Sequence, residues 1–128
     1  MRDPFPTAAK AMCFIVTADR AAAKKFYGEI LGFRQTGEDE YAVVYDLNGT
    51  MLRISTVAEH RGEPHTVLGW EVPDIVEAVS TLTAKGVVFN RYPYFEQDEL
   101  GIWTAPGSGN RVAWFFDPDG NNLSLAQF

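Results

Sequence analysis

The sequence has few of the residues on which covalent and metal chemistry most often depend. Its 128 residues include one cysteine, Cys13, and two histidines, His60 and His65. A single cysteine excludes an internal disulfide, and the strand pattern predicts a core position for Cys13, with no histidine placed to activate it. The histidines are five residues apart, which matches neither a helix face nor a strand face. Shared metal binding and solvated loop histidines therefore both stay open.

Long apolar runs and excess positive charge are missing as well. No run is long enough for a membrane helix or a signal peptide, so we expect a cytoplasmic protein with no membrane partner. The formal charge is -6 and the pI is near 4.8. A protein with this negative charge repels polyanions, which argues against nucleic acid as a partner. With 46% hydrophobic residues, the chain suffices for one well-cored domain over residues 1–128. We expect its partner to be a small-molecule ligand.

The sequence does contain an internal repeat of two copies. Each copy has a strand, an Asp that caps a helix, and further strands that end in a hairpin led by Gly. The caps Asp19 and Asp74 are 55 positions apart, whereas Gly49 and Gly120 are 71 apart, so the second copy carries 16 extra residues. The repeat predicts an α+β fold of two tandem βαβββ modules that curl around a cleft, and clefts hold small molecules.

Periodicity and turn residues set the expected elements. Module one covers about 11–57, with a strand at 12–16, a helix from Asp19 to Gly32, and strands near 33–36, 41–47 and 51–57. Asn48-Gly49 predicts a tight hairpin turn. The connector is 58–65. Module two covers about 66–128, with a strand at 67–72, a helix at 74–85 stopped by Gly86, and strands near 87–91, 111–116 and 122–127.

The extra residues of the second copy fall at about 92–110, in a segment that is long and aromatic for a solvated loop. We interpret it as a lid or wall of the cleft, with Trp103 as its ligand-facing anchor. Packing on the core or on a partner subunit is the equal alternative. Trp114, on the strand that follows, is a further candidate for the cleft.

Several motifs together resemble a known superfamily. They are Phe26-Tyr27 in the helix after Asp19, then Leu31-Gly32-Phe33, and Asp117-Pro118-Asp119-Gly120-Asn121 before the last strand. With the repeat, the chain from 11 to 128 resembles the vicinal oxygen chelate superfamily of glyoxalase, bleomycin-resistance and extradiol dioxygenase proteins. The resemblance implies a curved, U-shaped mixed sheet around a cleft, and commonly a homodimer. It also implies, in the metal enzymes, His, Glu or Gln ligands on the first and last strand of each module.

Carried onto this sequence, the four ligand positions of the superfamily fall at Met12, Arg53, Val67 and Ser124. A thioether, a cation, an alkyl group and a neutral hydroxyl are not ligands that a divalent metal selects. We therefore expect no metal site and no cofactor.

Strand alternation extends this inward-facing set. If those four positions face the cleft, so do Phe14, Ser55 and Glu71. Arg53 and Glu71 should pair with each other or with a ligand, because a buried unpaired charge is costly. We favour Arg53 as the anchor of a ligand carboxylate or enolate; solvation at the rim is its alternative. The predicted ligand-binding residues are Met12, Phe14, Arg53, Ser55, Val67, Glu71, Trp103, Trp114 and Ser124.

Three functions fit these features. The first is a metal-free protein of the bleomycin-resistance type that holds an aromatic or amphipathic ligand at a dimer interface. The second is a lyase, isomerase or dioxygenase that uses an unorthodox metal site, or Arg53 and Glu71 for proton transfer without metal. The third is a regulatory or scaffold dimer whose aromatic insertion meets a protein partner. The sequence alone leaves open whether the chain is an enzyme.

Overall fold

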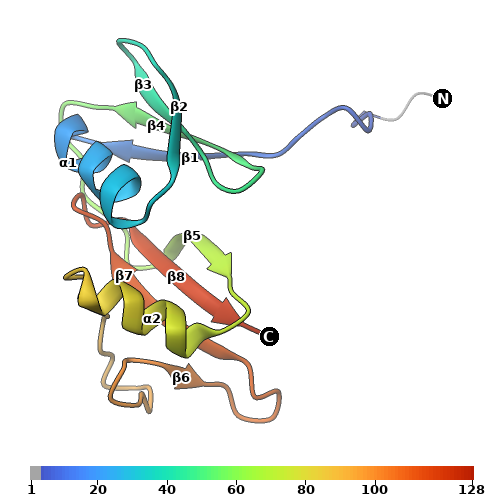
Figure 1. Ribbon diagram of the computed structural model, residues 1–128, viewed down its shortest axis with the longest axis vertical. Coiled ribbons are helices and arrows are strands. Elements are labelled where there is room, and N and C mark those ends of the chain that lie inside the picture. The colour runs from blue at the N-terminus through green and yellow to red at the C-terminus, as the bar shows by residue number, and fades with distance from the viewer. Residues whose placement is uncertain (1–3) are drawn as a thin grey trace. The chain divides into compact units, whose positions relative to one another are not determined.

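The computed structural model describes residues 4–128, and its chain contacts divide into two compact units, Met1–Ala58 and Glu59–Phe128. Each unit contains one four-stranded mixed sheet and its own helical segment (Figure 1). These are two tandem βαβββ-like modules, which confirms the predicted α+β class. Over residues 4–128, no helix is long and apolar enough to cross a membrane.

The first sheet has the strand order β1-β4-β3-β2. Strand β1 pairs with β4 in parallel, and the other neighbours are antiparallel. The bounds are β1 Met12–Thr17, β2 Arg34–Glu38, β3 Ala42–Asp46 and β4 Met51–Thr56. The predicted hairpin turn lies between β3 and β4, where Asn48 and Gly49 have φ angles of 58° and 114°. Both positive values suit the turn type that Asn-Gly favours.

The helical segment of the first unit begins as predicted but changes from an α-helix to a π-helix. The Asp19 side chain caps α1, Arg20–Lys24, by accepting a hydrogen bond from the Ala22 N–H at 3.1 Å. The chain then widens into a π-helix, η1, Lys25–Ile30, in which the Leu31 N–H donates to the Phe26 carbonyl at 2.8 Å. A single regular helix was expected, and a switch to five-residue spacing leaves no clear trace in side-chain periodicity.

The second sheet repeats this topology, with the order β5-β8-β7-β6. Its elements are β5 Thr66–Glu71, α2 Ile75–Ala84, β6 Trp103–Thr104, β7 Arg111–Phe116 and β8 Asn122–Gln127. Asp74 caps α2 through the Glu77 N–H at 3.1 Å, and Lys85 ends it, as the sequence predicts. A register shift between Thr66 and Leu68 leaves Val67 in a bulge of β5.

The predicted strand at 87–91 is wrong. Only Phe89 forms a bridge there, to Phe115, and the short strand β6 inside the insertion takes the outer place on β7. The Gln97 side chain accepts from the Tyr92 N–H and donates to the carbonyls of Asn90 and Gly101, at 2.7–2.9 Å. These backbone groups are satisfied by a side chain, so no further strand is needed to pair them.

Side chains of one parity are buried in each sheet, on the face covered by its helix. The alternation places Ile15, Leu52 and Ile54 in the core of the first unit, and Leu68, Leu123 and Leu125 in that of the second, as expected. Cys13 is only half-buried. The opposite face, which we call the open face of each sheet, carries the candidate site residues.

The connector packs closely on the turn before β8. The His60 Nε2 lies 2.8 Å from Asn121 Oδ1, and the Asn122 amide donates to the Pro64 carbonyl at 2.7 Å. A side-chain carbon added at Gly62 would lie 1.8 Å from the Gly120 carbonyl oxygen. The connector is therefore fitted to this turn through a position that tolerates no side chain.

We predict that Gly62→Ala lowers the free energy of unfolding by about 1–3 kcal/mol, because the new methyl group overlaps backbone that cannot rotate away. Urea denaturation measures the change. The control is Gly37→Ala, where the nearest atom to the added carbon is a Val44 side-chain carbon at 4.0 Å. That variant should stay within about 0.5 kcal/mol of the parent. Equal stabilities for the two variants would contradict the close packing.

Candidate functional site

The open face of the first sheet brings together four of the predicted residues. Phe14 on β1 is in register with Arg53 on β4, and Ser55 lies two residues further along β4. Met12 and Phe14, on the edge strand β1, are 45% and 62% exposed, high values for large apolar side chains. Met51, which pairs with Met12, is exposed as well. This face is therefore an apolar surface with Arg53 beside it.

Arg53 has a partner that the sequence did not indicate. Its Nη2 lies 3.9 Å from Asp39 Oδ2, whereas the predicted alternatives were Glu71 or a ligand. Asp39 also accepts hydrogen bonds from the N–H groups of Tyr41 and Ala42, at 2.8 and 2.9 Å. These two bonds, followed by the charge of Arg53, hold the pKa of Asp39 below its ordinary value. The carboxylate that faces Arg53 is thus fixed in place and ionised.

A hollow of about 550 Å³ adjoins this face at the start of β1. Its apolar lining includes Met12 and Met51, and its charged lining includes Lys10 and Arg34. Arg34 Nη2 lies 3.9 Å from Asp46 Oδ2, a second partly exposed ion pair. Asp46 lines the hollow too, so the hollow combines apolar side chains with two cations and one carboxylate, and it is large enough for a drug-sized molecule.

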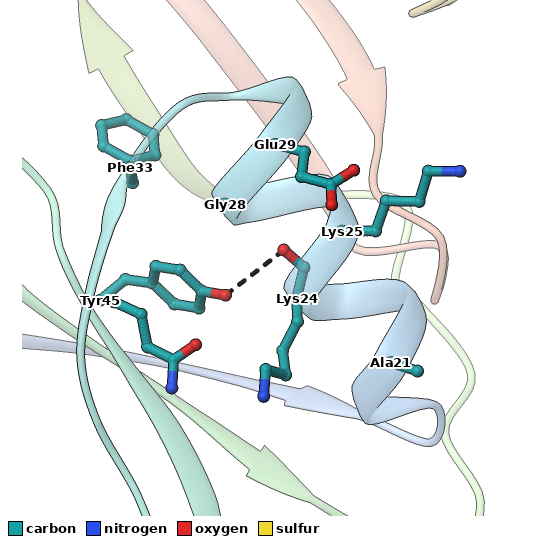
Figure 2. Close-up of a pocket in the computed structure, with 8 residues that line it drawn as sticks. Ala21, Lys24, Lys25, Gly28, Glu29, Phe33 and Tyr45 are labelled. Atoms are coloured by element: carbon teal, nitrogen blue, oxygen red, sulfur yellow. Dashed lines mark hydrogen bonds between the residues drawn. The ribbon is translucent and has the colours of Figure 1, made fainter.

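A second recess, of about 460 Å³, lies on the helix side of the same sheet (Figure 2). The Tyr45 hydroxyl donates to the Lys24 carbonyl across it, at 3.4 Å. Burial, and then the nearby Glu38 charge, raises the pKa of Tyr45. Lys24 Nζ is already paired with Glu38 at 2.8 Å, and Figure 2 shows the Lys25 amine directed away from Tyr45. The recess therefore presents little polar chemistry to a ligand.

The open face of the second sheet holds the other predicted residues in two rows. In one row, Gly69, Ser124 and Trp114 lie side by side across β5, β8 and β7. In the next row, the order across the sheet from β5 to β6 is Glu71, Ala126, Val112 and Trp103. Val67 is 40% exposed in its bulge. Large side chains thus lie on β6 and β7, and small ones on β5 and β8.

The insertion covers the β6 and β7 side of this face with rings. Phe95 lies nearly parallel to Trp114, with ring centroids 5.2 Å apart, and stacks on Trp103 at 4.6 Å. Tyr92 meets Trp114 edge-on at 5.6 Å. We call these residues the aromatic cluster: Tyr92, Tyr94, Phe95, Trp103 and Trp114.

Hydrogen bonds hold the loop that carries the aromatic cluster. The Arg91 guanidinium donates to the carbonyls of Gln97, Asp98 and Glu99. The Asp98 carboxylate accepts from the N–H groups of Leu100 and Ile102, both at 2.9 Å. The insertion is therefore a built wall on its own sheet rather than a loosely attached lid. Trp103 packs into that wall through Phe95, and whether it also meets a ligand stays a prediction.

The residues at the four metal positions do not fit a metal ion. Met12 and Arg53 share one open face, and the charge of Arg53 would repel a cation there. Val67 and Ser124, on the other sheet, offer an alkyl group and a neutral hydroxyl. Over residues 4–128, no three His, Cys, Asp or Glu side chains are grouped to hold an ion. His60 contacts Asn121.

The structure brings the predicted residues together as two groups. Met12, Phe14, Arg53 and Ser55 share the first open face, whereas Glu71, Trp103, Trp114 and Ser124 share the second, and Val67 lies in the bulge of β5. Sequence reasoning missed Asp39 and Phe95, because each acts through a contact across strands or within the insertion. The only sequence signal for Asp39 was its place in an acidic turn between two predicted strands.

We predict that Asp39 stabilises the fold in a pH-dependent way. A carboxylate with a lowered pKa stabilises the folded state above its unfolded pKa, and this contribution is lost as the pH falls through its folded pKa. The melting temperature of Asp39→Asn should therefore lie below that of the parent at pH 7, and the gap should close below about pH 4. Glu40→Gln, a change in the neighbouring exposed carboxylate, is the control. A gap independent of pH would contradict the role of Asp39.

We predict that Phe95→Ala loosens the aromatic cluster. Removal of a half-buried ring that stacks on two tryptophans should lower the free energy of unfolding by about 1–3 kcal/mol. It should also weaken the near-UV circular dichroism of the tryptophans, since their fixed surroundings are lost. Tyr41→Ala is the matched control, because Tyr41 is 67% exposed and lies outside the aromatic cluster, and it should leave the near-UV spectrum of the tryptophans unchanged. An unchanged near-UV spectrum in Phe95→Ala would show that the rings are not held as described.

Comparisons with known proteins agree with this geometry. The family model described as Glyoxalase/Bleomycin resistance protein/Dioxygenase superfamily matches residues 10–125. A comparison with curated protein sequences found no match. A glyoxalase family protein from Enterococcus faecalis is similar in structure, with 22% identity, a TM-score of 0.74, and 94% of this chain and 98% of that chain covered.

Two similar structures carry functional names. A fosfomycin resistance protein from Listeria monocytogenes has 11% identity and a TM-score of 0.73, with coverage of 96% and 95%. A lactoylglutathione lyase from Agrobacterium tumefaciens has 16% identity and a TM-score of 0.72, with coverage of 98% and 96%. At such identities the likeness shows the fold alone. The family model spans most of the sequence, and the chain belongs to the glyoxalase/bleomycin resistance protein/dioxygenase superfamily.

Proposed function

We propose that this protein binds an aromatic or amphipathic small molecule without a metal ion, as members of the bleomycin-resistance type do. The observation that carries the proposal is the donor set at the four ligand positions. Met12, Arg53, Val67 and Ser124 together supply one neutral oxygen and no carboxylate or imidazole. A metal-dependent reaction at these positions would lack the ligands that hold the ion.

The first open face supports the proposal because it offers a ligand both apolar surface and positive charge. Phe14 and Met12 present apolar surface, and the hollow at the start of β1 adds volume beside them. Arg53, Lys10 and Arg34 supply positive charge to an acidic group of the ligand. The apolar part of an amphipathic molecule would thus contact the apolar side chains, and its acidic group would contact the cations.

The proposal includes a homodimer. Exposed Met12, Phe14 and Met51 form an apolar patch on the edge strand β1 and its neighbour β4, which is costly to leave in water. A second copy that covers part of this face would bury the patch and enclose the ligand. The dimer and the cytoplasmic location both stay predictions.

An enzyme of the same superfamily is the second candidate. Asp39 pairs with Arg53, which lies on the open face, and a positioned carboxylate can serve as a general base. The lowered pKa of Asp39 makes this carboxylate a weak base. The observations therefore favour binding over proton transfer.

We predict that the purified protein, prepared without chelator, contains far less than one equivalent of zinc, nickel, manganese or iron by elemental analysis. It should also bind a naphthalene-based amphipath, detected by isothermal titration calorimetry, and addition of these metals should leave the affinity unchanged. Phe14→Ser should weaken binding by about tenfold, the effect of losing roughly 1.4 kcal/mol of apolar contact.

Val88→Ser is the matched control, since Val88 is 81% exposed and lies outside both open faces. Sedimentation of the same samples measures the oligomeric state. Stoichiometric metal in the purified protein would reject metal-free binding in favour of the enzyme. A monomer that binds the ligand would reject the dimer only.

A further inference from the structure

We propose that the second open face selects a ligand with a positively charged, ring-bearing group. This inference rests on the proposed function, which assigns an acidic group of the ligand to the first open face and assigns no charge to the group that meets the second. Three features of the second unit point to this ligand: a shelf of small residues on the sheet, a fixed aromatic wall beside it, and a strong excess of negative charge.

The shelf is made by small residues. Gly69, Ser124 and Ala126 occupy neighbouring positions on β5 and β8, in the same two rows as Trp114 and Glu71. A side-chain carbon at Gly69 would lie 2.5 Å from Ser124 Oγ, so the serine side chain leans over the glycine. The Ser124 hydroxyl therefore fills the space over Gly69, and with Ala126 it forms a low surface beside Trp114 on which a flat group can lie.

The aromatic cluster forms the wall of the shelf. Trp114 is adjacent to Ser124 in the sheet and is held by Phe95 and Tyr92 from two directions. A ring fixed in this way loses little freedom when a ligand packs against it. The face of an indole attracts both flat rings and cations.

The charge of the chain is unevenly divided between the units. Residues 1–58 contain seven Asp and Glu and seven Lys and Arg, whereas residues 59–128 contain ten acidic and four basic residues. The second unit therefore carries the whole formal charge of -6. Two of its four cations are already engaged: Arg91 with loop carbonyls, and Arg111 with the Gln127 side chain at 2.9 Å.

Glu71 places one of these negative charges at the end of the shelf. It is exposed on the open face of β5 and shares its row with Ala126, so only a methyl group separates it from the wall side. A cation on the shelf would meet the Glu71 carboxylate, the indole of Trp114 and the Ser124 hydroxyl. An anion would meet the same carboxylate and be repelled, and this difference sets the expected selectivity.

The test compares two probes with one ring system and opposite charge, 2-naphthylmethylammonium and 2-naphthoate, by calorimetry at low salt. The parent protein should bind the cation at least about tenfold more tightly, as expected for a cation–π contact plus an ion pair. In NMR spectra of the three tryptophan indole N–H groups, addition of the cation should cause the largest chemical-shift change at Trp114. Glu71→Gln should reduce the preference to below about threefold.

Glu77→Gln is the matched control, because it removes one negative charge of the same unit from α2, on the other face of the sheet. It should keep the tenfold preference. Gly69→Ala should weaken both probes, since the methyl group displaces the Ser124 hydroxyl into the shelf. A circular dichroism melt of each variant establishes that it is folded.

The outcomes separate the two proposals. If 2-naphthoate shifts the Trp114 indole signal with an affinity equal to that of the cation, or if Glu71→Gln keeps the preference measured at Trp114, selection by Glu71 on the second open face is wrong and ligand binding stands. If neither probe binds, both proposals are contradicted. If Glu71→Gln and Gly69→Ala change the sedimentation rate and leave probe binding unchanged, the shelf is a contact surface between copies, and the inference is overturned.

Discussion

The alternation of side chains across two four-stranded sheets is the constraint on which every other feature depends. One parity is apolar and buried beneath a helix, as with Leu52 and Ile54 in one unit and Leu123 and Leu125 in the other. The remaining parity is then free to carry chemistry, because the core does not need it. A slip of one residue in β4 would bury Arg53 and expose Leu52, so packing energy holds the register together with the Asn48-Gly49 turn.

The two units use the same topology for different surfaces. In the first, the open face is apolar, with Arg53 and Asp39 paired on it, and the hollow beside it adds Lys10 and Arg34. In the second, the insertion builds the aromatic cluster on β6 and β7, while small residues leave β5 and β8 bare. We therefore propose acidic groups as partners of the first face and cations as partners of the second.

The superfamily fold persists here although its four metal positions hold unsuitable residues. Those positions lie on the open faces, where a substitution changes the chemistry of the surface but not the core. Membership in the superfamily therefore fixes the scaffold and leaves the activity to the side chains on these faces. The proposed binding function follows from that separation.

The sequence by itself determined the repeat, the caps Asp19 and Asp74, the Asn48-Gly49 turn and the buried parity of each sheet. All of these are local patterns, set by neighbours a few residues apart along the chain. Only the tertiary structure decided that Asp39 pairs with Arg53 and that the helix widens to a π-helix in η1. It also decided that Trp103–Thr104, rather than the segment around Phe89, forms the outer strand beside β7. These depend on contacts between residues distant in sequence, or on backbone hydrogen bonds taken over by side chains such as Gln97, and periodicity carries no record of either.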